Sequence, residues 1–101
     1  MKYVVAMNFL RSGSAAENKA DQKELLELYA KWKPPAGMKI HEFLSRCDGG
    51  GGFTVIETDD AAELIGVTSK FAAFAEYQIY PVVEVADGVQ AAQEALSFLD
   101  S

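Results

Sequence analysis

The sequence predicts an α+β protein, specifically a ferredoxin-like plait in which two β-α-β units share one four-stranded antiparallel sheet. Two observations lead to this fold class. Segments typical of strands and segments with helical periodicity alternate in the order β-α-β-β-α-β-α. They all fit within 101 residues, a length that suits a single domain over residues 1–101 and is too short for two.

The first unit begins with a strand over Tyr3–Leu10, which is rich in strand-forming side chains. A helix follows and ends before Pro34-Pro35, because proline cannot continue a helix. The apolar face of this helix carries Leu25, Leu28, Tyr29 and Trp32. Two capping boxes compete for its start, Ser14 with Glu17 and Asp21 with Glu24.

A hairpin is expected in the middle of the chain, with strands over Met38–Cys47 and Phe53–Thr58. Asp48-Gly49 is a strong turn signal, and the further glycines up to Gly52 would supply positive φ or a bulge. The glycine run does not fit a phosphate loop, since a phenylalanine and a strand follow it instead of a lysine and a helix.

The loop length leaves two registers open for this hairpin. If Cys47 pairs with Phe53, then His41 and Glu57 share one face of the sheet, roughly 7–8 Å apart. A two-residue turn at Gly50-Gly51 instead moves Glu57 to the other face. In both registers Phe43 and Ser45 lie on the same face as His41.

The second unit opens with a capping box of Asp60 and Glu63, followed by a helix with one apolar face: Ala61, Leu64, Ile65 and Thr68. A strand is predicted over Phe74–Val85. A last helix begins at a capping box of Asp87 and Gln90, with an apolar stripe of Val89, Ala92, Leu96 and Leu99.

Right-handed crossovers place the strands in the order four-one-three-two, with two helices on one face of the sheet. The fourth strand is then at an edge, where Pro81 is tolerated because no N–H donor is needed. The first strand is central, and neither of its alternating sets of side chains is polar. Something must cover the open face. We expect a second copy of the sheet, so that the protein is a homodimer; the alternative is the last helix of the same chain.

Composition excludes several partners. Nine basic and 15 acidic residues give a net charge of −6, so phosphate backbones and anionic membranes are repelled, and neither nucleic acid nor a membrane is an expected partner. A single cysteine forms no internal disulfide and fits a reducing compartment, so we expect a cytoplasmic protein. The apolar run at the N-terminus is interpreted as the first strand, not as an export signal.

Four stretches occur together in the chain: MKYVVAMNF at the start, WKPPAGMKIH (Trp32 to His41), RCDGGGGFTVIETDD (Arg46 to Asp60) and YPVVEV (Tyr80 to Val85). In combination they resemble a family of short bacterial proteins of unknown function related to the dimeric α/β-barrel superfamily. The resemblance implies a ferredoxin-like protomer that dimerises through its sheets into a barrel with a cavity. That superfamily includes cofactor-free monooxygenases, isomerases, haem-binding enzymes and ligand-sensing domains, so the resemblance assigns no single chemistry and no catalytic residue.

His41, the only histidine, is the candidate acid or base, with Glu57 as its partner. The competing interpretation of His41 is a packing residue with a satisfied hydrogen bond. No spacing of His, Cys and Asp suggests a metal site, and no cofactor is expected. The candidate cavity residues all lie on predicted strands: Asn8, Phe43, Ser45, Tyr77, Gln78 and Tyr80.

The function hypothesis is therefore a dimer that binds a small apolar or aromatic molecule. In its enzymatic version, His41 acts on a phenolic or enolisable compound without a metal, as in a cofactor-free monooxygenase or an isomerase. The alternative is a non-catalytic ligand-sensing or protein-interaction module. A cavity of about 300–1,000 Å³ with His41 pointing into it would favour the first version.

Overall fold

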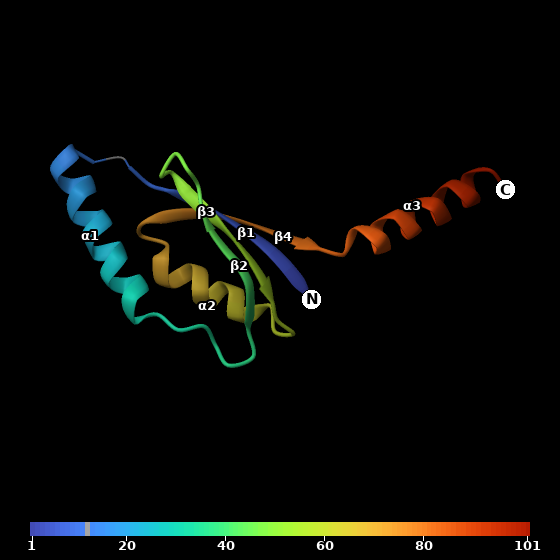
Figure 1. Cartoon of the computed structure of the whole chain (residues 1–101), viewed down its shortest axis with the longest axis horizontal. Helices are drawn as coiled ribbons and strands as arrows, with labels where there is room; N and C mark the ends of the chain where they lie inside the picture. The colour runs from blue at the N-terminus through green and yellow to red at the C-terminus, as the bar shows by residue number, and fades with distance from the viewer. Residues whose placement is uncertain (12) are drawn as a thin grey trace.

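The computed structural model describes residues 1–11 and 13–101 and has the predicted element order, βαββαβα (Figure 1). The elements are β1 (Lys2–Phe9), α1 (Ala15–Lys31), β2 (Lys39–Ser45), β3 (Gly51–Glu57), α2 (Ala62–Phe71), β4 (Ala75–Val82) and α3 (Val85–Leu99). The four strands form one antiparallel sheet in the order β2-β3-β1-β4. This confirms the predicted strand order and agrees with a ferredoxin-like plait.

The hydrophobic core lies between one face of the sheet and α2. Val5 of β1 and Ile56 of β3 pack there with Leu64 of α2 and with Met38, which precedes β2. All four side chains are at most 7% exposed. Alternation along the strands places Tyr3 on the same side, so β1 contributes every second side chain to the core.

Helix α1 lies on the same side of the sheet and is held by its C-terminal half. Tyr29 stacks on Phe71 of α2, with ring centroids 4.7 Å apart, and meets Phe43 of β2 edge-on. Ser14 is the N-cap, because its hydroxyl accepts a hydrogen bond from the Glu17 N–H. Of the two competing capping boxes, the first therefore sets the start of the helix.

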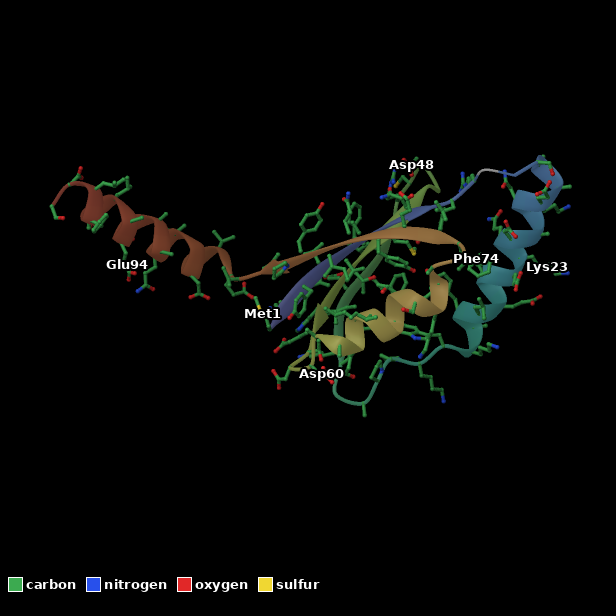
Figure 2. The ribbon with its side chains drawn as sticks, turned by 180° about the vertical axis from the view of Figure 1, so that it is seen from behind. Met1, Lys23, Asp48, Asp60, Phe74 and Glu94 are labelled. Atoms are coloured by element: carbon green, nitrogen blue, oxygen red, sulfur yellow. The ribbon has the colours of Figure 1, made fainter. Side chains whose placement is uncertain are left out.

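The other face of the sheet is uncovered. We call it the open face; the strands present on it Val4, Ala6, Asn8, Leu44, Phe53, Val55, Gln78 and Tyr80, and also the charged Lys2, Lys39, Glu42, Glu57 and Glu76. Helix α3 does not cover it, because this helix projects from the end of β4 away from the body and has no buried residue (Figures 1 and 2). In Figure 2 the labelled Glu94 on α3 lies far from every other element.

The hairpin differs from both predicted registers. Ile40 pairs with Ile56, but the next pair is Glu42 with Val55, so His41 is an extra residue in a bulge. The turn also contains only the first two residues of the glycine run. Gly51 and Gly52 belong to β3, where they pair with β1 and β2.

Element boundaries shift at two helices. Asp60 and Glu63 do not form a capping box, because the N-cap position of α2 is Ala61 and Glu63 instead accepts a hydrogen bond from Thr58. Helix α3 begins at Val85, so Asp87 lies in its first turn and β4 ends three residues earlier than predicted. A carboxylate in the first turn stabilises a helix through its dipole without being the cap.

Gly51 is required by the close approach of β3 to β1. Its φ is 154°, and a Cβ added there would lie 1.8 Å from the carbonyl oxygen of Met7. We expect Gly51→Ala to lower the free energy of unfolding by at least about 1–3 kcal/mol, measured by urea denaturation. Gly66 in α2 is the control, since a Cβ there meets nothing within 4 Å. Gly66→Ala should raise stability by roughly 0.5–1 kcal/mol. An unchanged urea midpoint for Gly51→Ala would contradict the pairing.

Candidate functional site

A groove lies between α1 and the nearby ends of β1, β2 and β3. Its volume is about 840 Å³, within the usual range for small-molecule pockets of about 300–1,000 Å³. We call it the α1 groove. Its apolar lining includes Met7, Phe9, Leu25, Tyr29, Trp32 and Phe43.

The groove follows from the sequence of α1. Residues 15–24 read AAENKADQKE and contain no apolar side chain larger than alanine. This half of the helix has nothing to bury against the sheet, so it leans away, while the half containing Leu25 and Tyr29 stays in contact. On the opposite wall, Gly51 and Gly52 line the groove.

An aromatic clamp closes the inner end of the groove. Trp32 meets Phe71 edge-on at 6.1 Å, and Tyr29 donates a hydrogen bond from its hydroxyl to the sulfur of Met7 at 3.0 Å. Burial raises the pKa of Tyr29, and burial together with the nearby Tyr29 raises the pKa of Tyr77 well above its ordinary value. Tyr29, the one of these two tyrosines that lines the groove, is therefore neutral at physiological pH and adds no charge to its inner end.

The outer rim of the groove is polar and carries an excess of positive charge. Arg11, Lys19 and Arg46 line it together with Asp21, and the charge of Arg46 is offset by the nearby Asp48. Arg46 is held in place by Asn8, whose amide oxygen accepts a hydrogen bond from it at 2.8 Å, and by an ion pair with Asp48. The excess stands out in a chain with a net charge of −6.

The hairpin loop beside this rim is ordered by its own hydrogen bonds. Asp48 accepts a hydrogen bond from the Gly50 N–H at 2.8 Å, and Arg11 donates one to the Gly49 carbonyl. The Gly50 N–H bond and the Arg46 guanidinium lower the pKa of Asp48. Gly49 has a φ of 71°, which is why glycine is favoured at this turn position.

The pair His41 and Glu57 lies on the open face, on the other side of the sheet from the groove. Nε2 of His41 is 2.7 Å from Oε1 of Glu57. The bulge produces this contact, because it turns the extra residue of β2 toward the face on which Glu57 lies. The hydrogen bond with His41 lowers the pKa of Glu57. Nearby, Lys2 forms an ion pair with Glu84 at 2.6 Å, so this end of the open face is charged.

The predicted site residues are divided between the two faces. His41, Glu57, Asn8, Gln78 and Tyr80 lie on the open face, whereas Phe43, Ser45 and Tyr77 lie on the helix side. Both predicted registers were wrong in placing His41 on the face of Phe43 and Ser45, because neither included the bulge. Of these eight residues only Phe43 and Ser45 line the α1 groove.

Sequence reasoning missed the contribution of α1 to the groove. Leu25, Tyr29 and Trp32 were predicted only to share the apolar face of this helix, and in the structure they also line the groove. The signal was the contrast between the two halves of α1, with apolar residues confined to the second half.

Two further properties of the described residues bear on function. No group of three or more His, Cys, Asp or Glu side chains lies close enough together there to hold a metal ion. None of the helices in that part of the chain is both long and apolar enough to cross a bilayer.

The profile of a family described as "Domain of unknown function (DUF3303)" matches residues 1–96, which include every strand and all but the end of α3. No curated protein matches the chain.

The contact between His41 and Glu57 predicts a titration. The carboxyl carbon of Glu57, followed by NMR, should titrate below the ordinary value of 4.5 and return toward it in His41→Ala. Because the folded-state pKa is the lower one, the contact stabilises the fold above pH 4.5, and this contribution is lost as the pH falls through the folded-state pKa. An ordinary pKa in the wild type, or no change in His41→Ala, would mean that the contact does not form in solution.

Proposed function

The chain belongs to the DUF3303 family, and we propose that it is a cytoplasmic homodimer that binds a small apolar or aromatic molecule in the α1 groove. The observation that carries this proposal is the groove itself, which has the volume of a small-molecule site and an aromatic inner wall. Cys47, the only cysteine, is free and exposed, which suits a reducing compartment.

The lining of the groove indicates the chemical class of the ligand. Tyr29, Trp32 and Phe43 offer ring edges and faces to a flat apolar body. The cationic rim around Lys19 and Arg46 lies at the other end, where it would attract an acidic group. A flat aromatic carboxylate matches both ends, with its ring against the clamp and its carboxylate at the rim.

The homodimer is proposed because the open face has no cover in the single chain. Phe53, Leu44 and Tyr80 are 45%, 52% and 49% exposed on that face, next to the half-buried Val4 and Val55. A contiguous apolar surface of this kind on a soluble domain marks an interface. A second copy of the same sheet offers a surface of matching shape and chemistry under a two-fold axis.

An acid–base role of His41 is the second candidate, favoured by its 2.7 Å contact with Glu57. These residues lie on the opposite side of the sheet from the groove, so the reacting molecule would have to occupy the space between two copies. During a titration with naphthoic acid, the imidazole NMR signals of His41 should then move. If the imidazole signals of His41 stay unchanged while naphthoic acid saturates the groove, His41 takes no part in a reaction of this ligand, and the protein only binds it.

Ligand binding in the α1 groove has a built-in reporter, because Trp32 is the only tryptophan. Naphthoic acid should quench or shift the fluorescence of Trp32 in a saturable way. Phe43→Ala should weaken this binding by roughly 1–2 kcal/mol, because it removes an aromatic wall. Titration of Trp32 fluorescence in both proteins measures the effect.

Phe53→Ala is the matched control for that experiment. Phe53 and Phe43 are 45% and 48% exposed on adjacent strands but lie on opposite faces of the sheet. The control should bind naphthoic acid as the wild type does. Equal weakening by both substitutions, or by Phe53→Ala alone, would place the ligand outside the α1 groove.

The open face should control the oligomeric state. Phe53→Lys places a charge on this face, so we expect it to convert the dimer to a monomer in sedimentation or light scattering. Ile65→Lys is the control, since Ile65 is 68% exposed on α2 and away from the open face. It should remain a dimer. A wild-type monomer, or a Phe53→Lys dimer, would contradict the proposed interface.

A further inference from the structure

Helix α3 is an amphipathic helix without a partner in its own chain. Its 15 residues include no buried side chain. At 100° per residue one apolar stripe is formed by Val85, Val89, Ala92, Leu96 and Leu99, whereas Phe98 falls on the other side of the helix. Val85, Leu96 and Leu99 are 81%, 61% and 72% exposed. An isolated helix of this length is marginal in water, so the stripe needs a surface to pack on.

The position of α3 prevents it from packing on its own sheet. Only Val83 and Glu84 separate it from β4, and Glu84 is tied to Lys2 of β1 by a 2.6 Å ion pair. The helix therefore continues outward from the edge of the open face, and the molecule extends to 63 Å in that direction (Figure 2). Any second copy that docks on the open face meets α3 beside it.

The charges on α3 indicate whether its apolar stripe packs on a membrane or on protein. Asp87 and Glu94 lie opposite the stripe, and the helix has no Lys, Arg or His. An acidic helix is repelled by anionic lipid, so a membrane surface does not suit it. It suits a docked arrangement in which the stripe faces protein and the carboxylates face water.

The size of the interface indicates that the sheet alone is not enough. The open face offers roughly a dozen side chains over four strands, whereas a standard interface uses about 20–30 residues on each side. Contacts made by α3 would supply much of the difference. One chain thus carries both an uncovered apolar sheet and an uncovered apolar helix, and two copies can cover both surfaces at once.

We propose that α3 is an exchanged arm: in the homodimer, the apolar stripe of α3 in each copy packs on the other copy at the margin of its open face, beside the contact between the two sheets. This inference rests on the proposed homodimer and adds a contact that the sheet interface does not require. Each copy then contributes one arm and receives one, as two-fold symmetry demands.

The test uses the full chain with the photoreactive residue p-benzoylphenylalanine in place of Leu96, mixed with nitrogen-15-labelled wild-type chains. Illumination should join labelled and unlabelled chains, and the joined peptides should come from β1, β3 or β4. The same photoreactive residue in place of Glu94, on the other side of α3, is the matched control and should give no such product. Sedimentation of the same samples reports whether dimers are present.

A second measurement does not depend on photochemistry. Leu96→Asp should raise the dimer dissociation constant at least about tenfold, whereas Gln90→Asp, on the polar side of α3, should leave it unchanged. Three results would contradict the exchanged arm without contradicting the homodimer. They are cross-links between two α3 helices, cross-links within one chain, and a dimer dissociation constant that Leu96→Asp leaves unchanged. A monomeric wild type would overturn both.

Discussion

The pairing of β1 on both of its edges is the constraint on which the rest of the structure depends. Because β3 and β4 flank it, β1 has no free edge, and its side chains can only point to the two faces of the sheet. Val5 and its neighbours on one face build the core with α2. Val4 and Ala6 on the other face are apolar as well, and no element of the described chain covers them.

The glycines make this central pairing possible. The backbone of Met7 approaches β3 so closely that a methyl group at Gly51 would overlap its carbonyl oxygen, and Gly52 stands in the same relation to Leu44. The run of four glycines that first suggests a ligand-binding loop is thus divided. Gly49 adopts the positive φ of the turn, and Gly51 and Gly52 allow close pairing within the sheet.

The chain keeps its two chemical features on opposite sides of the sheet. The α1 groove lies on the helix side because the alanine-rich half of α1 cannot pack, while Tyr29 and Trp32 anchor the other half. The contact between His41 and Glu57 lies on the open face. The groove and the histidine are therefore separated by the sheet.

Sequence alone determined the element order, the strand order and the edge position of Pro81, because these depend on local periodicity, helix caps and the handedness of crossovers. It also singled out His41 and Glu57 as a pair. It did not determine their face, because one bulged residue reverses the alternation of β2, and no local signal marks that bulge. The tertiary structure alone decided that α3 leaves the body and that α1 opens a groove. Both outcomes depend on which apolar surfaces find a partner within one chain, and that is a property of the packed fold.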